Sequence, residues 1–310
     1  MSKTRYGIVI CLLLFGGCRP ASDGLTDTGR VLLRGLAGAK LGVVAVQDAN
    51  IAYMERNAVG PTVVLLHGFA SEKDSWLRFL RKIPKDYRIV ALDLPGHGSS
   101  SRDADRVYDM DTMVELVESA IHALTEEPAH IVGTSLGGMI ATLYTSRNLE
   151  RVRTLALYAP AGVYPPHPSE FQLLLDQGEN PLIAYSRQDF DRLMDIVFFD
   201  PPPLVWPIGA AIRHYAIERA PFHQKIWNDI WPDHPTLDEL LPGIAVPVLL
   251  VWGKNDRVLD VSSTEVFARL LPRVETVVVD RLGHATVNEK PAEMARLQRD
   301  FLQRHAAGSN

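Results

Sequence analysis

Three residues whose side chains could act together occur in the order Ser, Asp, His along the chain. Ser135 is the central residue of Gly133-Thr-Ser-Leu-Gly137, while Asp256 and His284 each follow an apolar run. A serine hydroxyl becomes a nucleophile when a histidine takes its proton and a carboxylate holds that histidine in the correct tautomer. The sequence therefore predicts nucleophilic chemistry at Ser135, with His284 as the general base and Asp256 as the acid.

The segment around Ser135 has the context that a reactive serine needs. A strand-like run at His130–Val132 leads into the G-x-S-x-G sequence, and a predicted helix over Met139–Ser146 follows it. On such a sharp, strained turn, side chains two residues before and after the serine would collide with backbone, which explains the glycines. The turn would lift Ser135 above a sheet and direct the Leu136 N–H toward a developing oxyanion.

A second oxyanion donor is predicted after an earlier strand, which ends in His67-Gly68-Phe69. Gly68 lets the backbone turn toward the pocket, so the Phe69 N–H is the natural donor. His67 could be mistaken for the base, but it precedes the serine, whereas serine hydrolases with this strand–serine–helix turn have the order Ser, acid, His. We expect His67 to be a buried residue whose hydrogen bonds shape the loop.

The acid has a nearby rival in sequence. Asp256 lies in the loop directly after Val248–Gly253, and Asp260 lies four residues further on. The strand that ends at Tyr158 is followed by Ala-Pro-Ala-Gly, which offers no carboxylate. Asp93 is prominent in Asp93-Leu-Pro-Gly-His-Gly98, but we expect it to order that loop by accepting backbone N–H bonds. Asp256 is therefore the preferred acid.

Apolar runs of strand length alternate with helical stretches, which indicates βα units and a mostly parallel sheet. Several runs lack polar alternation, as expected for strands covered on both faces. An opening hairpin is predicted from Val43–Val46 and Ile51–Met54. The remaining predicted strands are Thr62–Leu66, Arg88–Leu92, His130–Val132, Thr154–Tyr158, Val246–Trp252 and Glu275–Val279.

Strand-like runs are absent between Gly162 and about Leu241, where helical stretches alternate with proline-rich joints. We interpret this region as a helical cap inserted into the sheet domain. Its aromatic residues either pack between cap and body or line an apolar substrate pocket. These residues are Phe198, Phe199, Trp206, Trp227 and Trp231. The helices are expected at Glu170–Asp176, Asp189–Phe199, Val205–Arg219 and Phe222–Trp231.

The bulk composition indicates an ordinary globular enzyme. The chain has 310 residues, is 46% hydrophobic and 22% charged, and carries a net charge of −5. No basic stripe suggests a nucleic-acid partner. No segment reaches the about 18 uninterrupted apolar residues of a standard transmembrane helix. The oligomeric state is not indicated by the sequence.

The first residues read as an export signal. Lys3 and Arg5 precede an apolar run, Ile8–Phe15, and two glycines then lead to Cys18. This order predicts a bacterial lipoprotein signal in which Cys18 is lipidated, although Phe15 stands where such signals prefer Leu, Val or Ile. A plain cleaved signal, a short uncleaved anchor or a cytosolic protein are the alternatives.

Lipidation at Cys18 would hold an exported protein at a membrane surface of the cell envelope. The other cysteine, Cys11, lies inside the signal, so no disulfide or metal–thiolate site is expected. The predicted organisation is a signal over residues 1–18, a tether over 19–38, a first core part over 39–161, the cap over 162–241 and a second core part over 242–310.

Taken together, these motifs resemble the α/β-hydrolase superfamily over about residues 40–305. The segments Pro160-Ala-Gly162 and Trp252-Gly-Lys-Asn-Asp-Arg-Val-Leu-Asp-Val261 are similar to those of monoacylglycerol lipases of the α/β-hydrolase-domain group and of cold-adapted bacterial lipases. The resemblance implies an α/β-hydrolase fold with an inserted helical cap and cleavage of carboxylic esters, often of glycerol, without a cofactor or metal. It assigns Ser135, Asp256 and His284 as the triad.

The resemblance leaves other activities open. Relatives that are dehalogenases or epoxide hydrolases use an aspartate nucleophile, and position 135 is serine. Hydrolases of C–C bonds and amidases do use serine and are the alternative enzymes. A non-catalytic ligand-binding member is a further alternative, although such members often lose a triad residue and this chain keeps all three.

Overall fold

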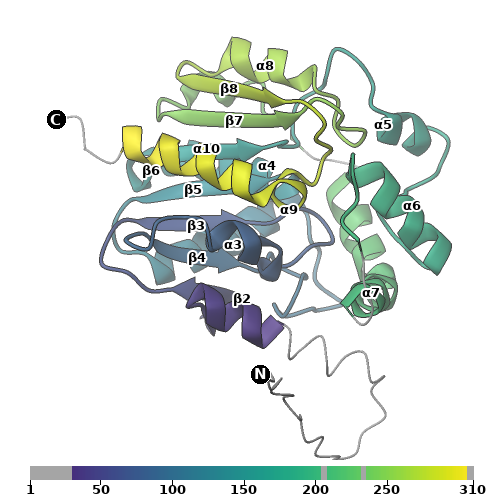
Figure 1. The fold of residues 1–310 in the computed structure, drawn as a ribbon, viewed down its shortest axis with the longest axis horizontal. Coiled ribbons are helices and arrows are strands. Elements are labelled where there is room, and N and C mark those ends of the chain that lie inside the picture. Colours follow the sequence, from purple (N-terminus) through teal and green to yellow (C-terminus); the bar gives the residue numbers. More distant parts are fainter. Residues whose placement is uncertain (1–29, 204–207, 232–234, 306–310) are drawn as a thin grey trace, which may run out of the picture.

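A single eight-stranded sheet forms the centre of the computed structural model, which describes residues 30–203, 208–231 and 235–305. The strand order is β1-β2-β4-β3-β5-β6-β7-β8 (Figure 1). β2 runs antiparallel to both of its neighbours, and every other pair is parallel. The strands are β1 Lys40–Val46, β2 Ala49–Arg56, β3 Thr62–Leu66, β4 Arg88–Leu92, β5 Ala129–Thr134, β6 Val152–Tyr158, β7 Val248–Gly253 and β8 Val274–Val279.

This architecture confirms the predicted fold class, and every predicted strand is present. β3 and β4 have the predicted bounds, and the opening hairpin is β1 paired with β2. β7 begins at Val248 rather than at Val246, because Pro247 has no N–H to donate to a ladder. β3, β4 and β5 are almost fully buried, as expected for strands covered on both faces.

Helices cover both faces of the sheet and enclose two apolar cores. One core contains residues of α3, α4 and α8, and the other contains residues of α2 and α10 together with Val287 of α9. Asp109 begins α3 by accepting a hydrogen bond from the Thr112 N–H at 2.8 Å. These helices are α2 Leu77–Leu80, α3 Met110–Leu124, α4 Leu136–Arg147, α8 Ser263–Leu270, α9 Thr286–Glu289 and α10 Pro291–Arg304, and the 3-10 turns are η1 Lys73–Trp76, η2 Leu149–Arg151 and η4 Leu241–Gly243.

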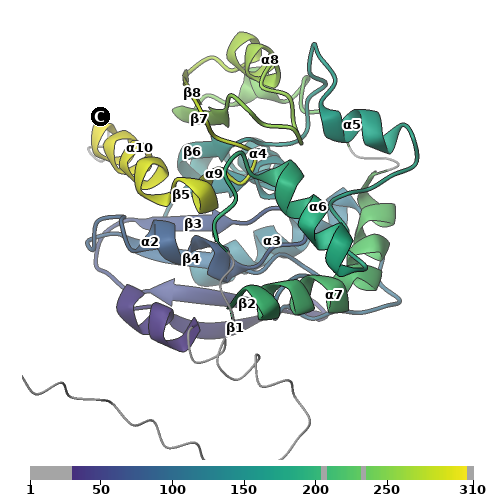
Figure 2. The same ribbon diagram turned by 45° about the vertical axis from the view of Figure 1, so that its right-hand side comes forward.

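A helical insertion separates β6 from β7, in the region predicted to be the cap. It contains α5 Glu170–Leu175, α6 Arg187–Val197 and α7 Ile208–Ile230. The two helices expected on either side of Pro221 are one helix, which changes direction along its length (Figure 2). Proline removes one backbone hydrogen bond and bends a helix, but buried contacts of Ala220 and Ile226 hold both arms in place.

The described chain begins with a helix over residues 30–37, although a tether was expected as far as residue 38. Leu33 and Ala37 pack on the core that contains α2 and α10. The signal, Cys18 and residues 19–29 lie outside the described residues. Within the described ranges, no helix is long and apolar enough to cross a membrane.

Candidate functional site

Ser135 lies on a strained turn between β5 and α4. Its φ and ψ are +53° and −123°, a region that non-glycine residues rarely occupy. A Cβ on Gly133 would lie 2.2 Å from the Gly137 carbonyl oxygen, and a Cβ on Gly137 would lie 2.3 Å from that of His67. Both glycines are therefore required by close backbone approach, as the sequence predicts.

Hydrogen bonds fix the strained turn. The Ser135 N–H donates to the Tyr158 carbonyl at 3.1 Å. The Ser135 carbonyl accepts from the N–H groups of Gly138, Met139 and Ala161 at 2.9, 3.1 and 3.1 Å. The side chain is partly exposed while Leu136 is buried. The hydroxyl group thus stands at the N-terminus of α4, where the helix dipole favours negative charge.

The loop after β3 lies directly against this serine. A Cβ on Gly68 would be 3.1 Å from the Ser135 Cβ and 3.7 Å from its Oγ. Within the described part of the chain, neither the Phe69 N–H nor the Leu136 N–H donates to a protein acceptor. Neither of the two predicted oxyanion donors is therefore occupied by a protein acceptor among the described residues.

Asp256 and His284 are in direct contact. The Nδ1 of His284 lies 2.8 Å from the Oδ2 of Asp256, whose side chain is fully buried. The other carboxylate oxygen accepts from the N–H groups of Val258 and Leu259 at 2.8 and 2.9 Å. These bonds hold the carboxylate in place, and its contact with Nδ1 orients the His284 ring.

The loop that carries His284 is held by the helical insertion. The Ala285 N–H donates to the Val197 carbonyl at 2.9 Å. A Cβ on Gly283 would lie 2.6 Å from the Phe199 nitrogen, so only glycine permits this approach. The end of α6 therefore positions the histidine loop.

The predicted site residues all follow carboxyl ends of parallel strands, namely β3, β5, β7 and β8. They consequently meet at one edge of the sheet, where ligands bind in open α/β sheets. Among the described residues, no hydrogen bond joins the Ser135 Oγ to His284. Bonds of this kind often tighten only when substrate is bound.

The residues set aside in the sequence have the structural roles expected of them. His67 is buried; its Nδ1 pairs with the Gly68 carbonyl at 2.8 Å and its Nε2 accepts from the Leu94 N–H at 3.0 Å. Burial lowers the His67 pKa. Asp93 accepts from the Lys73 N–H at 2.6 Å and from its Nζ at 2.7 Å. Asp260 accepts from the Ser262 N–H at 2.9 Å and has no contact with His284.

Sequence reasoning missed an aromatic enclosure around the Phe69 ring. Ring centroids lie 5.5 Å from Trp227, 5.9 Å from His223 and 5.9 Å from His97. Burial lowers the pKa of His97 well below its ordinary value and that of His223 to about 4, so both rings are neutral at pH 7. Because Trp227 and His223 belong to α7, the helical insertion contacts the loop of Phe69 directly.

An apolar groove of about 370 Å³ is lined in part by Ala70 and Ser71, which follow Phe69 in sequence. It passes between the helix of residues 30–37 and the insertion. Phe198, which the sequence offered as a pocket residue, lines it. Other lining side chains include Leu33, Met194, Ile212 and Tyr215.

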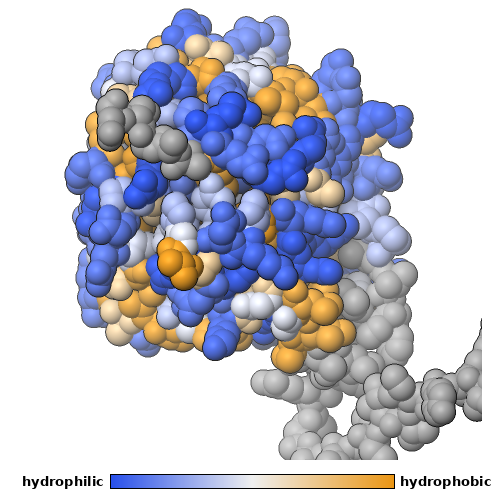
Figure 3. Space-filling view, turned by 60° about the vertical axis from the view of Figure 1, so that its left-hand side comes forward, coloured by the Kyte–Doolittle hydropathy of each residue, from blue (hydrophilic) through white to orange (hydrophobic). Residues whose placement is uncertain are grey.

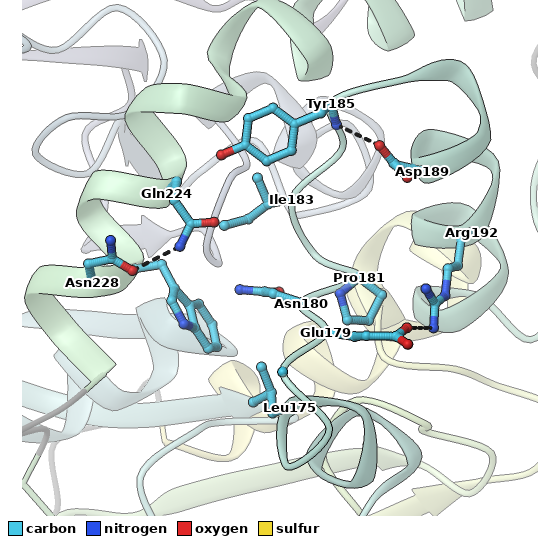
Figure 4. Close-up of a pocket in the computed structure, with 12 residues that line it drawn as sticks. Leu175, Glu179, Asn180, Pro181, Ile183, Tyr185, Asp189, Arg192, Gln224 and Asn228 are labelled. Atoms are coloured by element: carbon cyan, nitrogen blue, oxygen red, sulfur yellow. Dashed lines mark hydrogen bonds and ion pairs between the residues drawn. The ribbon is translucent and has the colours of Figure 1, made fainter.

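A separate hollow of about 620 Å³ lies within the insertion between the α5–α6 connection, α6 and α7 (Figure 4). Figure 4 shows the ion pair of Arg192 with Glu179 on one side of it and the hydrogen bond of Gln224 with Asn228 on the other. None of the predicted catalytic residues lines this hollow. Among the described residues, no group of three or more His, Cys, Asp or Glu side chains is placed to hold a metal ion.

The family model described as "Alpha/beta hydrolase family" matches residues 63–297. The chain belongs to this family. It is 34% identical over 272 residues to monoacylglycerol lipase abhd6-B of Xenopus laevis, covering 82% of this chain and 79% of that one. It is 26% identical to Lipase 3 of Moraxella sp. (strain TA144), covering 81% of each chain.

Among solved structures, a bacterial membrane phospholipase A described as a virulence factor is 40% identical. It superposes with a TM-score of 0.89 and covers 92% of each chain. These matches place the chain with the lipase- and esterase-type hydrolases of the family.

Proposed function

We propose that this hydrolase cleaves carboxylic esters of acylglycerols or similar lipids through an acyl-enzyme on Ser135. The observation that carries the proposal is the common edge of the sheet. There the strained Ser135 lies against Gly68 of the loop after β3, and the His284 Nδ1 lies 2.8 Å from the Asp256 Oδ2. This is the set of parts that acyl transfer needs: nucleophile, base, orienting acid and oxyanion donors.

In the proposed reaction, the Ser135 Oγ attacks the ester carbonyl carbon and its proton passes to the His284 Nε2. The N–H groups of Phe69 and Leu136 stabilise the oxyanion of the tetrahedral intermediate. Collapse of the intermediate expels the alcohol, which takes the proton from His284. Water then attacks the acyl-enzyme by the same route, releasing the acid and restoring Ser135. Asp256 stays ionised throughout and orients His284.

The lipid-like substrate is supported by the apolar groove next to the loop of Phe69, the proposed oxyanion loop. An acyl chain bound there would lie against Ala70, which follows Phe69 in sequence, and against Ile212, while Ser135 itself does not line the groove. The relatives named monoacylglycerol lipase and membrane phospholipase A also favour a lipid ester. In this proposal residues 162–241 form a cap that covers the site.

The same proposal places the enzyme at a membrane of the cell envelope. The apolar run Ile8–Phe15 followed by Cys18 supports export and lipidation of that cysteine. Mass spectrometry of the mature N-terminus tests this part: an acylated Cys18 is expected, and an unmodified N-terminus at another residue contradicts it.

A substrate panel tests the activity. Monoacylglycerols, triacylglycerols, short p-nitrophenyl esters and matched anilides should be offered to the wild-type enzyme and to Ser135→Ala. We expect ester turnover by the wild type, highest on monoacylglycerols, and loss of turnover in the variant. Turnover of anilides alone, or undiminished ester turnover by Ser135→Ala, would contradict the proposal.

A further inference from the structure

The helix of residues 30–37 is held to the body on two of its sides. Leu33 and Ala37, four residues apart, face the sheet and join its apolar core. Next to them around the helix lie two arginines, whose charges are compensated by acidic residues of the 72–74 segment. The ion pairs are Arg30 with Glu72 and Arg34 with Asp74.

The remaining side of this helix is apolar and is exposed in the described part of the chain. The exposed fractions of Val31, Leu32 and Leu36 are 64%, 63% and 61%. Leu32 and Leu36 are one turn apart and so share a face. At 100° per residue they point away from Arg34, which is bound to η1, and therefore toward the β1 edge of the sheet.

β1 continues this apolar surface. Leu41 and Val43 are 55% and 64% exposed. Leu41 pairs with Met54 and Val43 with Ala52, and paired residues of antiparallel strands point to the same face. Met54 belongs to the core on which Leu33 packs, so that face is the one the helix covers. Leu32, Leu36, Leu41 and Val43 thus form one surface. Together with Val31, which is exposed on the arginine side of the same helix, we name it the 31–43 patch.

The views agree with this placement. Figure 1 shows the first helix at the lower edge of the molecule, beside β2. In Figure 3, apolar side chains lie along that lower edge. A cluster of large exposed aliphatic side chains from a single short stretch of sequence is unusual for a protein surface that faces only water.

We propose that the 31–43 patch is a bilayer-contact surface that inserts into the interfacial region of a lipid membrane. Arg30 lies twelve residues after Cys18, so a fully extended chain puts the first helix at most about 40 Å from an anchor there. The patch is therefore within reach of any membrane that holds the N-terminus. Insertion by apolar side chains adds to such an anchor and fixes the orientation of the enzyme.

Two observations favour a bilayer over a second copy of the chain. Five side chains with exposed fractions of 55% to 64% are too few to supply the roughly 800 Å² per partner of a standard protein interface. The neighbouring arginines are already paired with Glu72 and Asp74. Binding should accordingly depend on apolar insertion, with little dependence on anionic lipid or on salt.

Docking through the 31–43 patch would also fix how the apolar groove is oriented relative to the membrane. Leu33 and Arg30, on the same helix, line this groove. A molecule docked by the 31–43 patch would therefore present that groove near the membrane surface. This consequence rests on the proposed lipid-ester activity, whereas the docking itself does not.

The first test measures insertion without requiring activity. The full chain carrying Leu36→Trp is bound to vesicles of phosphatidylcholine with plain or brominated acyl chains. We expect bromine to quench the added tryptophan, so quenching exceeds that of the wild type. Val278→Trp, on β8 at the opposite edge of the sheet, is the control and should show no added quenching. Equal quenching of Leu36→Trp and wild type would overturn the proposal.

The second test measures its effect on turnover. Leu32→Glu with Leu36→Glu should lower hydrolysis of monoacylglycerol in vesicles roughly tenfold while leaving a soluble short-chain ester unaffected. The pair Leu149→Glu with Val278→Glu, also exposed, should affect neither. Unchanged vesicle activity in the first pair would contradict the docking surface. A wild type that hydrolyses no ester would instead refute the proposed function, and the quenching result would still stand.

Sedimentation of the full chain in detergent identifies the competing occupant. If Leu32→Glu with Leu36→Glu dissociates an oligomer and the brominated lipids add no quenching, the patch is a subunit contact and the proposal is wrong. An unchanged association state together with added quenching supports the bilayer.

Discussion

Gly68 and Ser135 are so close that a methyl group on Gly68 would lie 3.1 Å from the Ser135 Cβ and 3.4 Å from the Thr134 carbonyl oxygen. Real Cβ contacts are seldom this short, so one of the two loops would have to move by a few tenths of an ångström. The Ser135 turn cannot yield easily, because its backbone is fixed by four hydrogen bonds. The spacing of Ser135 and the loop after β3 therefore depends on the missing side chain at position 68.

Gly68→Ala should lower kcat roughly 10- to 100-fold, because small displacements of reacting groups are costly. The Tm should change little, since the added methyl group lies at the loop and leaves the core packing intact. Steady-state kinetics on a soluble ester and a thermal melt measure both. Gly243→Ala is the matched control, because a Cβ there meets nothing within 4 Å. A fully active Gly68→Ala enzyme would refute the close approach.

Asp256→Asn should lower kcat on the order of 10⁴-fold, because an amide at this position favours the wrong tautomer of His284. Asp260→Asn is the comparison that matters, since Asp260 is the rival acid in sequence and only caps the Ser262 N–H. That variant should keep wild-type kcat. Inactivation by Asp260→Asn with retained activity in Asp256→Asn would reverse the assignment.

Trp227→Leu should lower kcat roughly tenfold with little effect on KM, because it loosens the enclosure that holds Phe69 and its N–H. A loss confined to substrate binding would raise KM instead. Phe171→Leu serves as the control: Phe171 contacts Trp227 with centroids 5.7 Å apart but is not among the rings around Phe69. If both variants behave alike, the effect belongs to the packing of the insertion and not to the oxyanion loop.

The buried His130 predicts acid sensitivity. Burial, reinforced by the nearby Arg153 charge, lowers its pKa from 6.5 to about 4. Between those two values the unfolded chain binds a proton that the folded protein excludes. The free energy of unfolding should therefore fall as the pH falls from 6.5 to 4, by on the order of 3 kcal/mol for this residue.

Urea unfolding at several pH values checks this expectation. His130→Phe, which cannot titrate, should show a shallower loss of stability below pH 6.5 than the wild type, and the slopes should coincide above pH 7. His223, whose pKa is also about 4, keeps part of the dependence in the variant. Identical pH profiles for wild type and His130→Phe would contradict the burial argument.

Much of the fold follows from local sequence. β3 and β4 have the predicted bounds because each is a short apolar run ended by polar or loop residues. The turn at Ser135 was predictable because its glycines, which are close to it in sequence, occupy positions where a Cβ would clash with backbone. Local sequence distinguishes Asp256 from Asp260 less clearly, because both follow β7. The contact of Asp256 with His284 is what separates them in the structure.

Other features depend on tertiary contacts that no local pattern records. Pro221 suggested a break between two helices, but buried neighbours on both arms of α7 keep the helix continuous. Residues 30–37 follow a polar stretch and were expected in a tether. They form a helix instead, because Leu33 and Ala37 pack on the core that contains α2 and α10. His223 and Phe69 are distant in sequence, so their ring contact had no spacing signal.

Labelling with a fluorophosphonate, followed by mass spectrometry of the digested protein, tests the central claim most directly. The reagent forms a covalent bond with a serine only when that serine is activated and its oxyanion site is open. We predict a single stoichiometric adduct on Ser135 in the wild type and none in Ser135→Ala. An adduct on another residue, or labelling of Ser135→Ala at the wild-type rate, would contradict the account.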